Sequence, residues 1–450
     1  MCAARQHSTA VVIGAGWAGC TAAVELARAG WSVTLLESAR ELGGRARVVQ
    51  ANGRALDNGQ HIMLGAYKDT LRMLKTVGID LGAAFLNLPL QMRYPPDSGG
   101  MDFIAPRLPA PLHLAIALLR AKGLTRADKM SLARFSTSAR WMDWTLYNDC
   151  SVTELLERFD QTDRLTSLMW RPLCLAALNT PPERASARVF LTVLRDSLGG
   201  ARASSDMLLP RLDLSALFPA RAGQFVTQRK GTVCAATKAV ALARSGQGWQ
   251  VSVSGSAVGG NQDIVADAVV LATPAPVAAT LLGPLASPAL AAQLTGFDYE
   301  PITTCYLQYP PATTLALPFY ALLDDAAKGH WGQFVFDRGQ LDQGQSGLLA
   351  VVISASQQAS NLDQAQLGAA IAAQLAQVFA RPELATPLSL QVITEKRATF
   401  ACRPNLERPP CDSGVSGLAL AGDYTASDYP ATLEAAVRSG SAAAALLMGS

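Results

Sequence analysis

Residues 14–19 read Gly-Ala-Gly-Trp-Ala-Gly, and this stretch decides the fold. An apolar run at Ala10–Ile13 precedes it, as in a buried parallel strand, and apolar residues at helical spacing follow it over Gly19–Ala29. A second strand is predicted over Trp31–Leu36, with Glu37 at its end. A strand, a glycine turn, a helix and a strand in this order predict a Rossmann-like α/β unit.

Each glycine of this stretch has its own task in a dinucleotide-binding turn. Gly14 permits the tight turn, Gly16 lets a pyrophosphate approach backbone N–H groups, and Gly19 allows helix and strand to pack closely. The helix start favours negative charge, and Glu37 is expected to accept hydrogen bonds from ribose hydroxyls. This motif alone does not separate FAD from NAD. The residues expected to contact the nucleotide here are Gly14, Gly16, Trp17, Ala18, Gly19, Glu37 and Ser38.

Two further segments carry related signals. Leu42–Arg45 reads Leu-Gly-Gly-Arg, where the glycines let the chain pass close to a cofactor and Arg45 offers forked donors to a pyrophosphate or a flavin. A surface turn with a solvated arginine is the alternative. Leu418–Gly422 is predicted to be a strand that ends in Gly-Asp, and Thr432–Leu447 a closing helix whose N-terminus would stabilise an anionic reduced flavin. Three such signals in this order predict FAD as the cofactor.

On these motifs the whole chain resembles the superfamily of flavin amine oxidases and carotenoid desaturases. The resemblance implies that Asp423 holds the ribityl chain, that the last helix points at the flavin N1–C2 edge, and that Val233 meets the adenine through its backbone. Amine oxidases usually place an aromatic residue where Thr432 stands, which puts amine oxidation in doubt. The resemblance adds Gly43, Gly44, Arg45, Gly59, Gln60, His61, Val233, Gly422, Asp423, Thr432 and Leu433 to the expected cofactor contacts.

The fold that follows is α/β with two domains. The first is a discontinuous Rossmann-like FAD domain, and the second is an α+β substrate domain with a mixed sheet and helices. The chain passes between them four times. The expected FAD-binding parts are residues 8–88, 219–284 and 411–450, and the expected substrate-domain parts are residues 89–218 and 285–410.

Other segments resemble the hydroxysqualene dehydroxylases, the squalene-associated FAD-dependent enzymes of bacterial hopanoid synthesis. They are Leu56–His61, Trp170–Cys174 with Ala177–Pro181, and Leu208–Leu214. The resemblance implies replacement of an allylic hydroxyl of hydroxysqualene by hydrogen, which gives squalene and water. Reduced flavin N5 would deliver hydride to an allylic cation in a dry site. Because the sequence shows a single dinucleotide fingerprint, an external flavin reductant is expected.

Three alternatives remain at this point. The first is an oxidative member of the superfamily, such as a phytoene desaturase or a protoporphyrinogen oxidase. The second is a non-catalytic flavin-fold protein that binds prenyl lipids, and the third is a nicotinamide dehydrogenase. A nicotinamide dehydrogenase is disfavoured by Gly-Gly-Arg and by the C-terminal Gly-Asp.

His61 is the first candidate for the acid that protonates the leaving hydroxyl, because imidazole titrates near neutral pH. The alternative is that His61 only packs against the isoalloxazine or bonds to it. Asp57 is expected to be a turn or helix-capping residue. Arg211 and Asp213 either line the substrate domain or form a structural ion pair.

The region of the predicted substrate domain is rich in aromatic and apolar residues. Trp141, Trp144, Tyr147 and Trp170 would suit a cation intermediate, but core packing is the expected role. Pro111–Arg120 is apolar and is followed by Lys122, Arg126 and Lys129, which suits docking on a membrane. A helix of this length is nevertheless expected to be buried core.

Composition limits the remaining possibilities. The chain has 450 residues, a net charge of +3 and scattered basic residues, which argues against a nucleic-acid partner. Its eight cysteines form no Cys-x-x-Cys pair, so no metal site is expected and the thiols are expected to be reduced. Met1–Thr9 is short and polar, and no apolar run reaches about eighteen residues. A cytoplasmic protein is expected, in peripheral contact with the membrane if the apolar stretch docks there.

Overall fold

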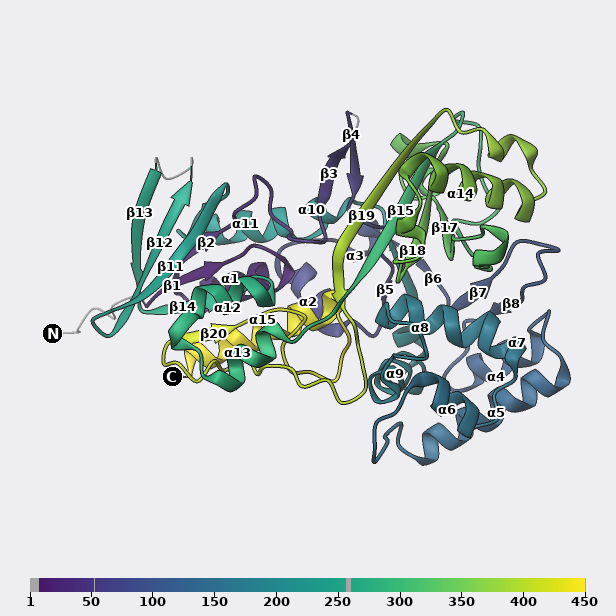
Figure 1. The fold of residues 1–450 in the computed structure, drawn as a ribbon, viewed down its shortest axis with the longest axis horizontal. Helices are drawn as coiled ribbons and strands as arrows, with labels where there is room; N and C mark the ends of the chain where they lie inside the picture. The colour runs from purple at the N-terminus through teal and green to yellow at the C-terminus, as the bar shows by residue number, and fades with distance from the viewer. Residues whose placement is uncertain (1–7, 52, 256–259, 450) are drawn as a thin grey trace.

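The structure is a computed structural model that describes residues 8–51, 53–255 and 260–449 (Figure 1). It has two lobes, one built on a parallel sheet and one built on an antiparallel sheet above a group of helices. The long strands β15 and β19 run from the centre of the molecule into the second lobe. Both described chain ends lie in the first lobe.

The first lobe contains a five-stranded sheet in the order β10-β2-β1-β14-β20, and its strand pairs are parallel. Val11 stands opposite Thr34 on one side and Val269 on the other. The predicted Rossmann-like unit is confirmed, and strands from distant parts of the chain complete it. The strands are β1 (Thr9–Ile13), β2 (Ser32–Leu36), β10 (Thr232–Cys234), β14 (Ala268–Leu271) and β20 (Leu418–Leu420).

Helices cover this sheet, and a small antiparallel sheet extends it. The first helix packs against the last one so closely that a Cβ on Gly440 would lie 2.2 Å from the Ala18 carbonyl oxygen. The helices of this lobe are α1 (Trp17–Arg28), α2 (Lys68–Thr76), α3 (Leu81–Ala84), α10 (Leu214–Leu217), α11 (Pro219–Gln228), α12 (Ala275–Leu282), α13 (Pro288–Thr295) and α15 (Leu433–Met448). The small sheet contains β11 (Thr237–Ser245), β12 (Gly248–Gly255) and β13 (Gly260–Ala266).

The second lobe contains a five-stranded sheet in the order β16-β17-β18-β15-β19 with antiparallel pairs. Successive side chains of a strand point to opposite faces. Cys305, Leu307 and Tyr309 therefore share the face that packs against helix α14 (Gln364–Val378). The strands are β15 (Tyr299–Gln308), β16 (Phe319–Ala321), β17 (Phe334–Asp337), β18 (Leu348–Ser354) and β19 (Ser389–Phe400).

Helices lie below this sheet, and short strand pairs connect the lobes. The helices are α4 (Leu112–Arg120), α5 (Arg126–Trp141), α6 (Val152–Arg158), α7 (Asp163–Leu165), α8 (Arg171–Leu178) and α9 (Ala187–Leu194). The short strands are β3 (Val48–Ala51), β4 (Arg54–Asp57), β5 (Met63–Leu64), β6 (Phe85–Leu88), β7 (Gln91–Arg93), β8 (Asp102–Ile104) and β9 (Met207–Pro210). Since β9 pairs with both β5 and β6, one sheet joins residues assigned to different predicted domains, and the domain boundaries stay a prediction.

The aromatic residues of the helical region differ in their exposure to solvent. Trp144 and Trp170 are buried, as expected, but Trp141 is 87% exposed and Tyr147 is 98% exposed. Core packing was thus wrong for these two. Helix α5 buries a stripe at helical spacing through Leu132, Phe135 and Ala139, and position 141 lies off that stripe.

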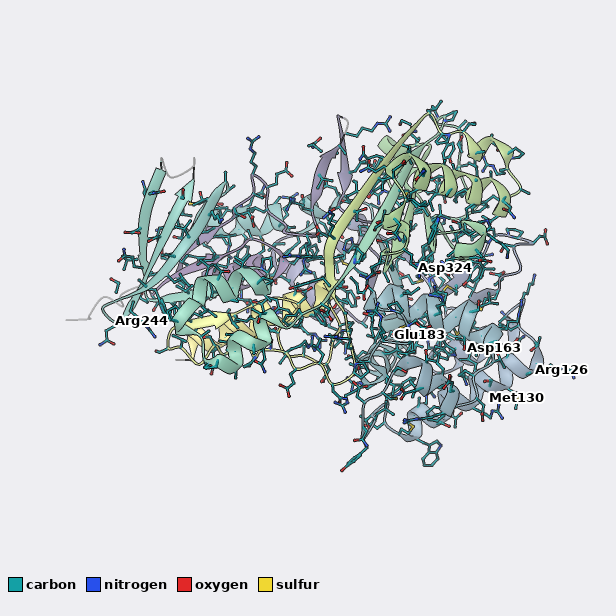
Figure 2. The ribbon with its side chains drawn as sticks, viewed as in Figure 1. Arg126, Met130, Asp163, Glu183, Arg244 and Asp324 are labelled. Atoms are coloured by element: carbon teal, nitrogen blue, oxygen red, sulfur yellow. The ribbon has the colours of Figure 1, made fainter. Side chains whose placement is uncertain are left out.

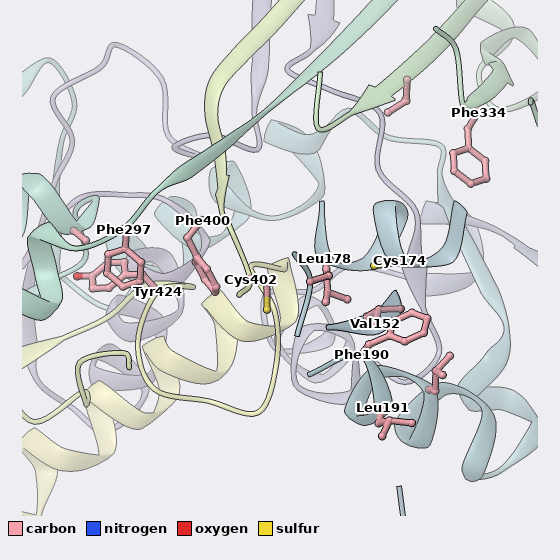
Figure 3. Close-up of a cluster of buried hydrophobic side chains, with 14 of the residues drawn as sticks. Val152, Cys174, Leu178, Phe190, Leu191, Phe297, Phe334, Phe400, Cys402 and Tyr424 are labelled. Carbon is pink, nitrogen blue, oxygen red and sulfur yellow. The ribbon is translucent and has the colours of Figure 1, made fainter. Parts of the chain in front are cut away.

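One hydrophobic cluster joins the lobes (Figure 3). Near the last strand of the parallel sheet, the ring of Phe297 lies 5.6 Å from that of Phe400 and 6.1 Å from that of Tyr424. The cluster continues past Cys402 to the helices around Phe190. The cysteines among the described residues are free thiols, while Cys2 lies outside those residues.

Candidate functional site

The predicted cofactor residues gather at the carboxyl ends of the parallel strands. Gly14 follows β1, Glu37 follows β2, and Gly422 and Asp423 follow β20. Val233 lies within β10, opposite Leu35 of β2. In open α/β sheets ligands bind at this edge.

The glycine turn is shaped by close backbone contacts. Gly14 has a φ of +99°, and a Cβ there would lie 2.6 Å from the Ala272 carbonyl oxygen. A Cβ on Gly19 would lie 1.8 Å from the Gly14 carbonyl oxygen. Helix α1 begins after Gly16 without a side-chain cap, so its first N–H groups remain available to an anion.

The Gly-Gly-Arg segment lies directly against this turn. The Gly43 N–H donates to the Ala15 carbonyl oxygen at 2.8 Å, and a Cβ on Gly44 would lie 3.0 Å from the Gly16 Cα. The Trp17 indole is buried and donates to the Ala46 carbonyl oxygen at 3.1 Å. The Trp17 side chain therefore helps to hold the end of the Gly-Gly-Arg segment in place. The two glycine segments, residues 14–19 and 42–45, thus form one continuous backbone surface, which is called the glycine floor below.

Glu37 binds the turn that it was predicted to accompany. Its carboxylate accepts hydrogen bonds from the Ala15 N–H at 2.9 Å and from the Ala39 N–H at 2.8 Å. The Ser38 hydroxyl donates to it at 3.2 Å. Oε1 accepts from both Ala39 and Ser38, whereas Oε2 accepts from Ala15 alone and keeps a second lone pair, so Glu37 can fix the turn and still accept from a ribose hydroxyl.

Segments from both ends of the chain meet beside this floor. Arg45 Nη2 donates to Asp423 Oδ1 at 2.6 Å, and Nη1 donates to the Ala398 carbonyl oxygen at 2.7 Å. Helix α15 starts close by in sequence, with Thr432 accepting from the Ala435 N–H at 3.2 Å. Arg45 is thus held by Asp423 and Ala398, while its side chain remains 38% exposed.

The loop of residues 57–61 carries His61. Its Nδ1 lies 2.9 Å from the Gly59 carbonyl oxygen, and because a carbonyl only accepts, Nδ1 carries the proton and Nε2 is left for a ligand. Burial lowers the pKa of His61. Gln60 accepts from Arg338 Nη1 at 2.8 Å, which ties the loop to the second lobe.

Asp57 is a buried capping residue, as expected. Its carboxylate accepts from the Leu214 N–H at 2.9 Å, at the start of α10, and lies 3.9 Å from Arg338. Burial raises its pKa to about 6, against the opposing effects of these two contacts. Asp213 also caps α10, accepting from the Ala216 N–H at 2.8 Å, while Arg211 is exposed. In the described part of the chain no ion pair joins Arg211 to Asp213, so of the two alternatives the ion pair between them is not supported, and Asp213 serves as a helix cap.

Other residues at the site carry no motif in the sequence. Arg338 follows β17 and contacts Asp57 and Gln60. Tyr306 of β15 donates to the Asp57 carbonyl oxygen at 2.8 Å. Only the packing of the second lobe against the loop brings them in.

The arrangement fits a bound dinucleotide on structural grounds: an uncapped helix start, a floor of glycines, and an arginine with an acidic partner at the same sheet edge. Fold and site define a flavin-dependent oxidoreductase. The chain belongs to the family of flavin-containing amine oxidoreductases, whose model matches residues 17–448. Its cofactor is FAD.

Individual relatives narrow the comparison. The chain is 29% identical to a hydroxysqualene dehydroxylase of Rhodopseudomonas palustris, over 98% of each chain. It is 28% identical to one of Sinorhizobium fredii, over 97% of each. Among solved structures it matches a putative protoporphyrinogen oxidase from Exiguobacterium sp. 255-15 with a TM-score of 0.68, at 17% identity over 98% of this chain and 99% of that one. The similarity to this solved structure shows the fold alone.

Proposed function

We propose that the protein is a hydroxysqualene dehydroxylase, which replaces the allylic hydroxyl of hydroxysqualene by hydrogen and releases squalene and water. The observation that carries this proposal is the end-to-end similarity to relatives of that name. The presence of Thr432 at the start of α15, where amine oxidases usually carry an aromatic residue, supports an alcohol rather than an amine as substrate.

The predicted contacts give each part of FAD a place in the site. The glycine floor and the start of α1 would hold the pyrophosphate, Glu37 the ribose, and Val233 the adenine. Arg45, Asp423 and the start of α15 would hold the ribityl chain and the flavin. The full proposed set is Gly14, Gly16, Trp17, Ala18, Gly19, Glu37, Ser38, Gly43, Gly44, Arg45, Gly59, Gln60, His61, Val233, Gly422, Asp423, Thr432 and Leu433.

In this proposal His61 is the acid. Its Nε2 faces the substrate while Nδ1 is held by the Gly59 carbonyl oxygen, and it gives a proton to the leaving hydroxyl. The C–O bond breaks, water departs, and a C–H bond forms at the same carbon. Bound FAD in its reduced form supplies the hydride for that bond. The alcohol brings no electrons for this reduction, so an external reductant is proposed to keep FAD reduced.

Apolar side chains cover the sheet face that also carries Tyr306, which contacts this loop. The face of the antiparallel sheet opposite to α14 presents Phe334 and Phe336 from β17, and Ala350 and Val352 from β18. All four side chains are buried in the cluster that also contains the helices below the sheet. Such surroundings exclude water from a cation and from a hydride.

The proposed function is tested by anaerobic incubation of the purified FAD-loaded protein, chemically reduced, with hydroxysqualene. Squalene is scored by mass spectrometry, and flavin reoxidation is followed by absorbance. We expect one squalene for each reduced flavin consumed. An oxidative enzyme would leave the alcohol untouched under these conditions, and a prenyl-lipid binder would bind it without turnover. Either result would contradict the proposal.

We further propose that the surface of α4 and α5 docks on an anionic lipid bilayer. Contrary to the expectation of buried core, α4 is a surface helix, with Leu112 55% exposed and Leu119 73% exposed. Lys129 of α5 donates to the Leu119 carbonyl oxygen at 2.8 Å, so the end of α4 lies beside the start of α5, where Met130 is exposed (Figure 2). Among described residues no helix is long and apolar enough to cross a bilayer.

The same surface contains a solvent-open cavity and a fringe of basic residues. A cavity of about 470 Å³ lies where the start of α4 meets the end of α5, and Pro111, Trp144 and Gly199 line it together with Arg140. Arg120, Lys122, Arg126 and Arg140 are exposed around the apolar side chains. Apolar area with a cationic rim favours anionic lipid surfaces, and a polyprenyl substrate dissolves in such a membrane.

A further inference from the structure

We propose that the hydroxyl of Thr304 holds the alcohol oxygen of the substrate beside His61. The inference rests on the proposed function, since it concerns how an alcohol is oriented for protonation. Two independent features of the structure carry it: an unpartnered buried hydroxyl, and the position of that hydroxyl at the loop of residues 57–61.

The Thr304 hydroxyl has no hydrogen-bond partner among the described residues, although the residue is only 1% exposed. Buried polar groups are nearly always paired, because leaving one unpaired costs free energy. The neighbouring Thr303 shows that the sheet supplies partners to structural hydroxyls. Its hydroxyl lies 2.9 Å from those of both Ser356 and Thr394.

The two threonines point to opposite faces of β15, as alternation requires. Thr303 shares its face with Cys305 and Leu307, which pack against α14. Thr304 shares its face with Tyr306, whose hydroxyl bonds to the Asp57 carbonyl oxygen at 2.8 Å and so fixes β15 over the loop. In register beside Thr304 stand Val352 and Ile393, which offer no polar side-chain atom.

His61 and Thr304 border the same point in space. A Cβ built on Gly59 would lie 3.9 Å from His61 Cε1 and 3.9 Å from Thr304 Oγ1. Gly59 has a φ of +97°, a conformation that disfavours other residues, so this point stays free of a side chain. An imidazole and a hydroxyl thus face the same point, next to the apolar side chains of Val352 and Ile393.

These surroundings suit a polyprenyl alcohol, which has a long apolar body and one polar oxygen. A threonine hydroxyl both donates and accepts, so it can pair with that oxygen while the hydrocarbon lies on the apolar sheet face. It does not supply the proton. His61 gives the proton, the C–O bond breaks to release water, bound reduced FAD would supply the hydride for the C–H bond, and Thr304 is unchanged at the end.

The test compares Thr304→Val, which replaces the hydroxyl by a methyl group of similar size, with Thr304→Ser, which restores it. Dissociation constants for hydroxysqualene and for squalene are measured on the oxidised FAD-loaded protein by flavin fluorescence. We expect Thr304→Val to lower the preference for the alcohol over the hydrocarbon by about tenfold, with squalene affinity unchanged, and Thr304→Ser to recover most of it. The melting temperature of Thr304→Val should equal or exceed that of the wild type, because an unpaired buried hydroxyl is removed.

Thr303→Val is the matched control on the same strand. It should lower the melting temperature, since two hydrogen bonds are lost, and leave the preference for the alcohol intact. The inference is overturned if Thr304→Val keeps the wild-type preference, if it melts markedly lower, or if it changes FAD affinity or the flavin spectrum instead. A wild-type protein that shows no preference for hydroxysqualene over squalene and no turnover overturns the proposed function itself.

Discussion

The His61 imidazole is the residue on which the proposed proton transfer depends. Replacing His61 by alanine should lower the rate of squalene formation by about 10²- to 10⁴-fold, the usual contribution of general acid catalysis. The rates are compared at equal FAD content, read from the absorption spectrum, because His61 is also one of the proposed cofactor contacts. Full turnover by the FAD-loaded variant would remove His61 as the acid and leave it a packing residue.

The pH dependence of turnover gives a second measure of the same residue. Only the protonated imidazolium can act as the acid, and burial lowers the pKa of His61 below its usual value near 6.5. The rate of the chemical step is therefore expected to fall as pH rises through a value below 6.5. Single-turnover reoxidation of reduced FAD by hydroxysqualene between pH 5 and pH 8 measures it. A rate that rises with pH over this range would contradict the assignment.

Asp57 should make the free energy of unfolding fall as pH rises, whereas a carboxylate with a lowered pKa makes it rise. Its pKa is raised from 3.8 to about 6 in the folded protein, so the folded state binds the proton more tightly than the unfolded state. The stabilisation is complete below pH 3.8 and is lost as pH rises through about 6, a change of about 3 kcal/mol. Urea unfolding of wild type and Asp57→Asn between pH 4 and pH 7.5 should show the free-energy difference changing in this direction. A difference of the opposite slope would mean that Arg338 outweighs burial.

At the scale of elements, two glycines of the same turn serve different purposes: Gly19 is needed for folding, and Gly16 is needed for cofactor binding. A Cβ on Gly19 would lie 1.8 Å from the Gly14 carbonyl oxygen, whereas a Cβ on Gly16 would lie 3.8 Å from the Gly44 Cα. Gly19→Ala should therefore destabilise the apoprotein by about 1–3 kcal/mol or more. Gly16→Ala should change apoprotein stability by no more than about 1 kcal/mol, yet weaken FAD binding at least about tenfold, because the methyl group takes the place where the pyrophosphate approaches.

Thermal unfolding of the apoproteins and FAD titration distinguish these two effects. Equal destabilisation by both substitutions would mean that Gly16 serves packing rather than the cofactor. FAD binding by Gly16→Ala at the wild-type level would remove Gly16 from the proposed contacts.

The elements that the sequence identifies are those whose residues act locally. Gly14, Gly16 and Gly19 lie within six residues, and together with the apolar residues on either side they predict the turn, the strand and the helix that the structure confirms. Thr304 and Arg338 give no such signal. Their roles arise because β15 and β17 of a different sheet lie over the loop of residues 57–61, at sequence separations above 240 residues. Periodicity near Thr304 predicts a strand, but not which hydroxyl lacks a partner.

Long-range packing, which local sequence does not reveal, also explains why the predicted burial of α4 and of Trp141 in α5 was wrong. An apolar helix of about nine residues is usually buried, so Leu112–Arg120 was expected to lie in the core. Burial depends on what packs against the helix, and of its nine described residues only His113 and Ala117 are fully buried, while Leu118 is partly buried against the core. Trp141 is exposed for a related reason, since α5 buries its other side.

At the scale of the whole molecule, three distant parts of the chain share one site, and two lobes share one hydrophobic cluster. Arg45 pairs with Asp423 and also donates to Ala398 at the end of β19, so the cofactor edge of the parallel sheet is closed by a strand of the second lobe. Tyr424, which follows Asp423, and Phe400, at the end of β19, both belong to the cluster that joins the lobes (Figure 3). The lobes are therefore expected to unfold together rather than as separate units.

The outer helices of the second lobe allow the membrane proposal to be tested on the intact protein. The FAD-loaded wild type should co-sediment with vesicles of phosphatidylglycerol and phosphatidylcholine at low salt. The double substitution Leu112→Asp with Leu119→Asp should weaken that binding at least about tenfold, because two exposed apolar side chains are lost and negative charge is added. Raising the salt concentration should weaken binding of the wild type, since the basic residues contribute through electrostatic attraction that salt screens.

Val265→Asp is the matched control, an equally exposed apolar residue on β13 of the other lobe. It should leave vesicle binding unchanged, because its strand lies far from α4 (Figure 1). Equal loss with this control would show a general effect of charge rather than a docking surface. A wild type that stays in the supernatant would contradict docking altogether, and the polyprenyl substrate would then have to reach the site from solution or from a carrier.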